Sequence, residues 1–337
     1  MMEFQEFDAE LEDWNAVRTE IPCTGLLIGN GASLAVWPGF SYDSLFENAQ
    51  RTKNRPLGLS ELAVFKTLET SNFEQVLSAL KNTIKVNAAL SISSSSPRNR
   101  YFAIKEALIH AVRGVHIPWK RVRPESLARI NAELGNYRTL YSTNYDLLNY
   151  WAIMQAPQPF KDLFWNGEAT FDLGNTETQG TRILYLHGGL HLVKNIDGST
   201  RKLLSSESTL LGSFAVNALG DVPLFVSEGN AEDKLKAIRN SDYLSYCYGQ
   251  LCQHQGALCV FGHSLGEQDQ HIVQAVLDAG IETLVISIYP RSKAFIQHQK
   301  RHYAKLFVGH DVSLRFFDAK SHPLGDPALL VAPEGVS

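Results

Sequence analysis

Short apolar runs alternate along most of this chain with stretches of helical periodicity. The helical stretches cover residues 145–153, 242–254, 269–279 and 292–307. Apolar runs cover residues 26–28, 139–142, 183–186, 224–227, 258–261, 283–288 and 312–317. These runs are continuously apolar, which is typical of strands buried on both faces of a parallel sheet. Their alternation with helices predicts an α/β fold: a Rossmann-like parallel sheet with helices on both faces.

A helical region interrupts this alternation at about residues 45–135. Asn72 can cap a helix whose apolar residues recur at helical spacing, and further helices are expected at residues 101–112 and 126–134. The serine-rich stretch 91–96, closed by Pro97, predicts a loop between two of them. We therefore expect one domain over residues 21–318 with a helical insertion. An acidic arm or short leading helix over residues 1–20 precedes it, and a tail over residues 319–337 follows it.

Composition narrows the function classes only moderately. The chain has 337 residues, of which 44% are hydrophobic and 20% charged, with a net charge of −4. This charge gives no general attraction to nucleic acid or to an anionic membrane. No apolar run reaches the roughly 18 residues of a membrane span, and the acidic N-terminus lacks the features of a signal peptide. We therefore expect a cytoplasmic protein without a membrane segment.

The four cysteines, Cys23, Cys247, Cys252 and Cys259, form no C-x-x-C pair. Zinc ribbons and disulfide frameworks use closely spaced pairs. The spacing therefore predicts free, mostly buried thiols and no zinc ribbon.

The helical insertion carries a group of basic residues with few acids nearby. A solvated helix surface explains such a group, and a docking patch for an acidic partner or a nucleic acid is the alternative. The residues are Arg98, Arg100, Lys105, Arg113, Lys120, Arg121 and Arg123.

Polar or glycine-rich segments follow four of the predicted strands. Ligands of open parallel sheets bind beyond the carboxyl ends of the strands, so we expect these segments to meet at one edge. In chain order they are Gly29-Asn30-Gly31-Ala32-Ser33, Thr143-Asn144-Tyr145-Asp146, His187-Gly188-Gly189 and Gly262-His263-Ser264-Leu265. Asp269 opens the helix after the last segment, where a helix-capping role is expected.

The first of these segments is typical of a nucleotide site. Glycine lets backbone N–H groups approach a ligand closely, and a helix start behind them favours a diphosphate. However, Leu34 stands where the dinucleotide fingerprint G-x-G-x-x-G needs its third glycine. A tight strand-to-helix turn therefore stays open as the alternative.

The order of the four segments resembles the sirtuin family. The glycine loop matches Gly29 to Ser33, the T-x-N-x-D motif matches Thr143, Asn144 and Asp146 with one residue fewer, the catalytic His-Gly matches His187-Gly188, and the late G-x-S-L turn matches residues 262–265. The resemblance covers roughly residues 22–90 and 137–290. It is greatest to a zinc-less bacterial branch with a G-N-G loop, in which several relatives hydrolyse NAD in defence against phage.

Two features of protein-deacylating sirtuins are absent from the sequence. The zinc-binding cysteine module is missing, and residues 39–46 stand where the family has the loop G-I-P-D-F-R, without its arginine. Both differences disfavour deacylation of a protein lysine, and they leave NAD binding and cleavage as the expected activity.

The resemblance implies roles for individual residues. NAD is the expected substrate, held by Gly29, Asn30, Gly31, Ala32, Ser33, Asp43, Thr143, Gly262 and Ser264. The backbone amides of residues 29–33 and Ser264 would hold the diphosphate. His187 would act as a base toward water or a ribose hydroxyl, Asn144 would orient one of these, and Asp146 or Asp43 would offer a carboxylate to the cationic transition state.

Each role has a structural alternative. His187 suits a hydrogen-bonded turn histidine, Asn144 a cap for a helix starting at Tyr145, and Asp146 a charge in the first turn of that helix. Two histidine pairs have the i, i+4 spacing of metal ligands, His187 with His191 and His298 with His302. Gly188 and Gly189 oppose a helix in the first pair and the second has no evident third ligand, so we expect no metal.

Three functions follow from these observations. The first is an NAD hydrolase that yields ADP-ribose and nicotinamide, acting as a regulated anti-phage effector. The second is a catalytically silent sensor or scaffold that binds NAD or ADP-ribose, and the third is a protein deacylase or ADP-ribosyltransferase. Because free NADase activity harms its host, the resemblance also implies control by homo-oligomerisation or by a HerA-like ATPase partner.

Overall fold

The computed structural model describes residues 7–40, 45–51, 56–164, 168–174, 179–194, 199–203, 222–226 and 230–332. Its centre is a seven-stranded sheet in the order β10-β9-β8-β1-β2-β4-β3. The strands are β1 (Cys23–Ile28), β2 (Thr139–Ser142), β3 (Phe160–Lys161), β4 (Thr181–Tyr185), β8 (Ala257–Phe261), β9 (Thr283–Ile288) and β10 (Ser313–Asp318). Every pairing in this sheet is parallel. The predicted Rossmann-like α/β fold is confirmed.

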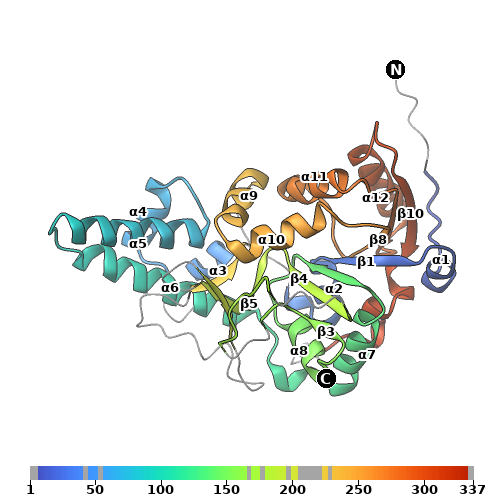
Figure 1. Ribbon diagram of the computed structural model, residues 1–337, viewed down its shortest axis with the longest axis horizontal. Coiled ribbons are helices and arrows are strands. Elements are labelled where there is room, and N and C mark those ends of the chain that lie inside the picture. The colour runs from blue at the N-terminus through green and yellow to red at the C-terminus, as the bar shows by residue number, and fades with distance from the viewer. Residues whose placement is uncertain are drawn as a thin grey trace.

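Helices cover both faces of the sheet. Figure 1 shows α10, α11 and α12 above the strands and α7 and α8 below them. Their bounds are α7 (Pro124–Leu134), α8 (Leu148–Gln155), α10 (Asp242–Leu251), α11 (Gln270–Asp278) and α12 (Lys293–Leu306), and α9 (Ala231–Arg239) packs beside α10 and α11. The central strand β1 is fully buried from Leu26 to Ile28, which agrees with its unbroken apolar sequence.

The position of β1 determines where a ligand can bind. Its neighbour on one side is β2 and on the other β8, so the connections that leave the two sides of β1 run in opposite directions across the sheet. Such a reversal opens a crevice at the carboxyl ends of the strands. The glycine segment after β1 begins at this point.

One predicted strand belongs elsewhere. We expected residues 224–227 in the parallel sheet, but β7 (Val222–Phe225) pairs antiparallel with β5 (Gly188–Lys194). With β6 (Thr200–Lys202), these strands form a separate three-stranded sheet. A short apolar run does not reveal which sheet it joins, because a buried antiparallel strand has the same composition as a parallel one.

The helical insertion consists of α3 (Leu45–Arg51), α4 (Leu59–Thr67), α5 (Phe73–Ala89) and α6 (Ser95–Val115), followed by α7 before β2. In Figure 1, α4, α5 and α6 extend away from the sheet as an arm. Pro97 lies inside the first turn of α6 rather than closing a loop before it. A proline fits there because the first-turn N–H groups have no partner within the helix.

Both ends of the described chain pack against the domain. In the N-terminal arm, α1 (Trp14–Glu20) follows Glu12, which forms a parallel bridge with Phe317. Residues 319–332, expected as a tail, instead form three short 3-10 turns, with Leu324 and Leu329 buried. The domain therefore continues beyond residue 318.

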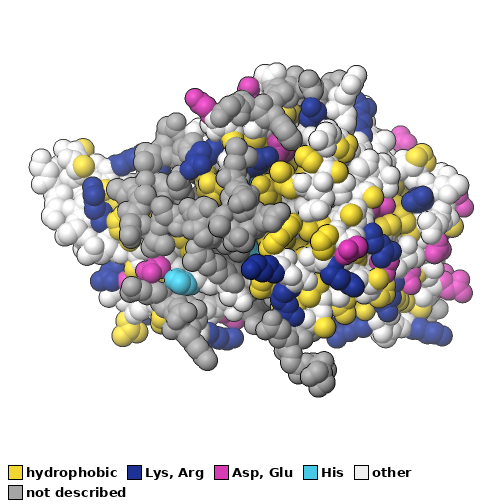
Figure 2. Space-filling view, turned by 90° about the horizontal axis from the view of Figure 1, so that it is seen from below, with side chains coloured by type: hydrophobic (Ala, Val, Ile, Leu, Met, Phe, Trp, Pro, Cys, Tyr) yellow, Lys and Arg dark blue, Asp and Glu magenta, His cyan; other side chains and the backbone are white. Residues whose placement is uncertain are grey.

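Several of the basic residues in the insertion are engaged within the protein. Lys105 is fully buried, and Arg100 forms an ion pair with Glu61. Arg121 lies 4.8 Å from the centre of the Trp37 ring, and Arg123 donates to the carbonyl of Ala328 at 2.5 Å. On the face in Figure 2, Lys and Arg side chains lie in separate groups rather than one patch. For these four residues, the contacts favour a structural role over a docking surface.

Among the described helices, none combines the length and the apolar character that a bilayer crossing requires.

Candidate functional site

The four predicted segments leave the central sheet at the same edge. Ile28 of β1 is in register with Ser142 of β2 and with Phe261 of β8, and Ser142 is in register with Tyr185 of β4. Adjacent strands lie about 4.8 Å apart, so the segments that follow these residues are neighbours. The segment after each strand therefore contributes to one candidate site.

The glycines after β1 pack against the segment after β8. The amide of Gly29 donates to the carbonyl of Phe261 at 2.9 Å, and that of Gly31 donates to the carbonyl of Gly262 at 2.7 Å. A Cβ at Gly31 would lie 2.6 Å from Cα of Gly262, so no larger residue fits. These contacts correct one expectation: the amides of Gly29 and Gly31 are bonded within the protein and do not face a diphosphate.

A chain of hydrogen bonds joins the first segment to the second. Nδ2 of Asn144 donates to the carbonyl of Gly29 at 3.0 Å and to Oγ of Ser33 at 2.9 Å. Ser33 in turn donates to Oδ2 of Asp146 at 2.5 Å. All three side chains are buried. Both amide hydrogens of Asn144 are therefore bonded to the segment after β1. Its Oδ1 is the side-chain atom with which it can bind a ligand.

The structural alternatives for Asn144 and Asp146 have different outcomes. Helix α8 begins at Leu148, after Leu147 as its N-cap, so Asn144 is not a helix cap. Asp146 accepts the amide of Leu148 at 2.9 Å as well as the Ser33 hydroxyl. Both carboxylate oxygens of Asp146 are thus bonded within the protein, one at the start of α8 and one to Ser33 of α2, which favours the structural role for this residue.

The other residues predicted to bind NAD lie in varied settings. Thr143 donates through its amide and its hydroxyl to the carbonyl of Ile28, at 3.0 and 3.1 Å. Asn30 and Ala32 lie in α2 (Asn30–Val36), and Ser264 is exposed. Oδ1 of Asn30 is buried and has no hydrogen-bond partner among the described residues. Asp43 lies outside the described residues, as do residues 227–229.

The backbone around His187 explains the glycine that follows it. Gly188 has φ +73, and a Cβ there would lie 2.0 Å from the carbonyl oxygen of Leu224. This left-handed residue turns the chain from β4 into β5, where Gly188 pairs with Phe225. His187 is therefore held at the corner between the two sheets.

The imidazole of His187 contacts a second imidazole, which belongs to helix α11. Its Nε2 lies 2.8 Å from Nε2 of His271, in the first turn of α11, and the rings stack with centroids 5.0 Å apart. Both histidines are buried. The remaining nitrogen of His271, Nδ1, is buried without a partner in the described chain. His187 is thus a hydrogen-bonded histidine at a turn, as the structural alternative predicted. This contact leaves its chemical role open.

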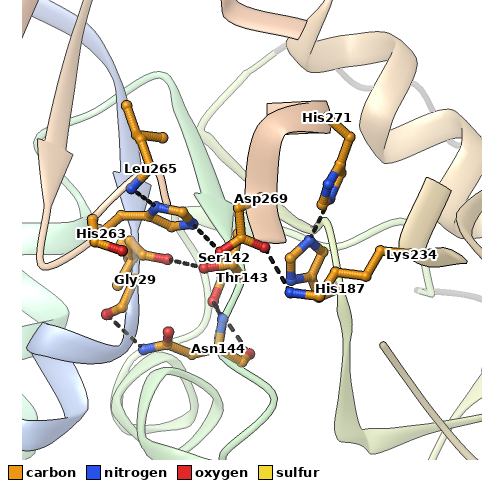
Figure 3. A network of polar contacts seen from close by, with 12 residues as sticks. Gly29, Ser142, Thr143, Asn144, His187, Lys234, His263, Leu265, Asp269 and His271 are labelled. Atoms are coloured by element: carbon orange, nitrogen blue, oxygen red, sulfur yellow. Dashed lines mark hydrogen bonds and ion pairs between the residues drawn. The ribbon is translucent and has the colours of Figure 1, made fainter. Parts of the chain in front are cut away.

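Asp269 connects this histidine pair to two further charged or polar side chains (Figure 3). Its Oδ1 accepts from Nζ of Lys234 at 2.8 Å, and its Oδ2 lies 3.8 Å from Nε2 of His263. His263 accepts the amide of Leu265 at Nδ1, so its neutral ring carries the proton on Nε2, toward Asp269. Asp269 makes no side-chain cap, which corrects the capping role expected for it.

Burial and charge set the protonation states in this cluster. Burial lowers the pKa of His187 well below its usual value and lowers that of His271 to about 4. Burial also lowers the pKa of His263. For Asp269, burial acts to raise the pKa, but the neighbouring imidazoles and the Lys234 ammonium hold it at about 2. At neutral pH the cluster therefore has three neutral imidazoles, one carboxylate and one ammonium.

The two histidine pairs with i, i+4 spacing lie in different parts of the structure. His191 lies on β5, where its ring stacks on Tyr150 with centroids 4.8 Å apart and packs against Tyr185 at 4.4 Å. His298 is exposed on α12, and His302 contacts the carbonyl of Ser264 at 2.9 Å. The four cysteines have free thiols; Cys247 and Cys259 are buried, and Cys23 and Cys252 are partly buried.

Sequence reasoning missed Lys234 and His271 and gave His263 no role of its own. The one signal was the short spacing Asp269-x-His271 at a helix start, because residues that far apart can face the same side of a turn. Nothing in the sequence relates Lys234 to that turn, since helix α9 reaches it only through the tertiary fold.

Comparison with known proteins gives a family and no activity. No curated protein matches the chain. Residues 26–324 match the family model described as "Domain of unknown function (DUF4917)", from β1 through the first turns after β10. This match covers most of the 337 residues, and the chain belongs to the DUF4917 family.

Proposed function

We propose that this protein binds NAD at the carboxyl edge of the central sheet and hydrolyses it to ADP-ribose and nicotinamide. The observation that carries the proposal is the meeting of four segments, after β1, β2, β4 and β8, at the point where strand order reverses. Dinucleotides bind at such points in Rossmann-like folds. The sirtuin-like order of the motifs in these segments supports NAD as the dinucleotide.

Polar atoms at this edge suit a ribose. Oδ1 of Asn30 is a buried acceptor without a donor in the described chain, and a ribose hydroxyl would supply one. Nδ2 of Asn144 is held by Gly29 and Ser33, which fixes its Oδ1 as a second acceptor. Because the amides of Gly29 and Gly31 are already bonded, the diphosphate would depend on other groups, among them the exposed Ser264.

Hydrolysis of NAD needs little acid catalysis from the protein. When the bond between ribose C1′ and the nicotinamide nitrogen breaks, its electron pair neutralises the positive charge of the ring, so nicotinamide leaves without a proton. Water then adds to the cationic ribose carbon and loses a proton to a base. If Nε2 of His187 donates to His271, Nδ1 of His187 carries the lone pair that can accept this proton.

A silent NAD-binding sensor is the second candidate. The specific observation in its favour is that much of the predicted machinery is bonded internally: the amides of Gly29 and Gly31, Nδ2 of Asn144 and both oxygens of Asp146. Such a protein would bind NAD without turnover.

Incubation of the pure protein with NAD, followed by chromatography of nicotinamide and ADP-ribose, separates the two functions. A hydrolase forms both products in equal amounts, and His187→Ala removes the activity while NAD binding persists. His298→Ala, an exposed substitution on α12, serves as the matched histidine control. NAD binding without products in every assembly state would leave the sensor, and absence of NAD binding would reject both.

The role in phage defence, the homo-oligomer and the HerA-like ATPase partner stay predictions of the sirtuin resemblance. We propose them as the means that keep NAD hydrolysis silent until a trigger arrives. Expression of the protein alone and with such an ATPase, with cellular NAD as the readout, tests this form of control.

A further inference from the structure

We propose that His187, Asp269 and His271 form a binding site for a divalent first-row transition metal ion. Each of the three residues offers one ligand atom, and these atoms lie within 4.8 Å of one another. Two imidazoles and one carboxylate, with positions left for water, are a recurrent set for zinc and for non-haem iron. A single carboxylate makes the site a poor one for Mg²⁺ or Ca²⁺, which prefer several oxygen ligands.

The two imidazoles need to move little to bind one ion. Their Nε2 atoms are 2.8 Å apart, and two imidazole nitrogens on a tetrahedral zinc ion lie about 3.3 Å apart when the Zn–N bonds are roughly 2.0–2.1 Å. The ion would replace the proton that now lies between the rings, and this proton would move to Nδ1 of the ring that carries it. No proton need leave the protein in this step.

The settings of His271 and Asp269 allow the adjustment. Within the described chain, the hydrogen bond to His187 is the one bond that the His271 ring makes, since its Nδ1 is buried without a partner. Among the described residues, no other hydrogen bond therefore holds the ring against a small shift. The Asp269 side chain is 21% exposed, so an ion can reach the site and keep a water ligand.

Lys234 now provides the positive charge that an ion would bring. Its ammonium lies 2.8 Å from Oδ1 of Asp269, and its side chain is 7% exposed. An ion at the three ligands would compete with this ammonium for the carboxylate. Lys234 therefore sets the affinity: weaker with the lysine present, tighter when its charge is removed.

The inference goes beyond NAD hydrolysis and does not depend on it. The metal site shares His187 with the proposed reaction, so an ion bound there would remove the base and inhibit turnover. Metal binding itself is measured without NAD, so its failure leaves the proposed hydrolase untouched, and inactivity toward NAD leaves the metal site untouched.

The test is titration of the full-length, metal-free protein with ZnCl₂ in a calorimeter and with CoCl₂ in a spectrophotometer. We expect one equivalent of each ion to bind, with Co²⁺ giving the visible absorption of nitrogen and oxygen ligation. His271→Ala and Asp269→Asn should each weaken binding at least about tenfold, as loss of a ligand exceeds the roughly 10–100-fold cost of losing an outer contact. Lys234→Gln should tighten it.

Controls make each result decisive. Circular dichroism shows whether a variant has folded; Asp269→Asn keeps the side-chain volume at a partly exposed position and covers the case in which His271→Ala misfolds. His298→Ala removes the exposed member of the histidine pair on α12, which can itself bind zinc at i, i+4 spacing. Absence of binding, binding lost with His298→Ala alone, or binding that persists in folded Asp269→Asn would each overturn the proposal.

Discussion

Nε2 of His187 lies 2.8 Å from Nε2 of His271, although the two residues are 84 positions apart in the chain. One follows β4 and the other lies in the first turn of α11, after β8, so their contact depends on the part of the sheet that joins β4 to β8. A hydrogen bond of this kind fixes the orientation and the tautomer of a histidine that acts as a base.

This contact predicts that His271 positions His187 in NAD hydrolysis. General-base catalysis contributes roughly 10²–10⁴-fold, so His187→Ala should lower kcat at least about a hundredfold. In His271→Ala the base remains but is no longer oriented, and we expect kcat to fall roughly ten- to a hundredfold with little change in KM. Steady-state kinetics measures both.

The conservative variant His271→Gln distinguishes positioning from folding. Glutamine can place a polar atom near the position of the imidazole Nε2, so it should restore part of kcat. Equal loss in His271→Ala and His271→Gln, with both proteins folded, would argue against a positioning role.

The contacts of Asn144 predict that its replacement lowers the stability of the protein as well as its activity. Asn144→Ala would remove two buried hydrogen bonds, those that Nδ2 of Asn144 donates to the carbonyl of Gly29 and to the hydroxyl of Ser33. A buried hydrogen bond contributes roughly 0.5–1.5 kcal/mol, so we expect the free energy of unfolding to fall by about 1–3 kcal/mol. Urea denaturation measures it, with Asn99→Ala, exposed on α6, as the matched control that should stay within about 0.5 kcal/mol of the wild type.

The sequence predicts every strand of the sheet except the two-residue edge strand β3, because the inner strands are short, apolar and buried on both faces. It also predicts that the segments after β1, β2, β4 and β8 share an edge, since parallel strands all end on the same side. It assigns the run 224–227 to the wrong sheet, because an apolar run carries no information about its neighbour in a sheet. The fold was thus accessible from local patterns, and sheet membership was not.

The interior of the site was much less accessible. The sequence suggests that Gly29 and Gly31 offer amides to a ligand, yet these amides bond to Phe261 and Gly262, which only the packing of β1 against β8 determines. The contacts of Lys234 and His271 with Asp269 and His187 likewise join segments with no common periodicity. Residue types at strand ends indicate where chemistry takes place, and tertiary contacts decide which atoms remain free for it.

Close packing of the two glycine segments predicts a large difference between two Gly→Ala substitutions. Gly262 has φ +66, and a Cβ there would lie 2.6 Å from the backbone nitrogen of Ala32. Gly280 has nearly the same conformation, φ +65, but nothing lies within 4 Å of a Cβ. The left-handed conformation costs alanine roughly 1–2 kcal/mol, and overpacking adds roughly 1–3 kcal/mol.

We therefore expect Gly280→Ala to lower the free energy of unfolding by about 1 kcal/mol and Gly262→Ala by about 3 kcal/mol or more. Chemical denaturation of the two variants measures the difference, which isolates the clash because the backbone penalty is common to both. Similar losses in the two variants would mean that the segments after β1 and β8 do not pack as closely as described.

His322 holds the C-terminal segment in place through contacts of both its ring nitrogens, and it predicts how stability changes in acid. Its Nδ1 accepts the amide of Leu324 at 3.1 Å, and its Nε2 lies 3.3 Å from Glu133 and 3.2 Å from the hydroxyl of Tyr137. Burial lowers the pKa of His322 from 6.5 to about 3. The unfolded chain therefore binds a proton between these values that the folded protein does not, and the stability present above pH 6.5 is lost as the pH falls toward 3.

Replacement by a residue that does not titrate should flatten this dependence. In His322→Asn, the side-chain oxygen can still accept the amide of Leu324, so the variant is expected to fold, with lower stability than the wild type at pH 8. Between about pH 6 and 4, the slope of its unfolding free energy against pH should be smaller by up to about 1.4 kcal/mol per pH unit, the value for one proton. Burial raises the pKa of Glu133, which has the opposite effect on stability but is common to both proteins. Urea denaturation at several pH values gives the two curves; they should converge toward acid, and parallel curves would show that His322 does not carry the acid sensitivity.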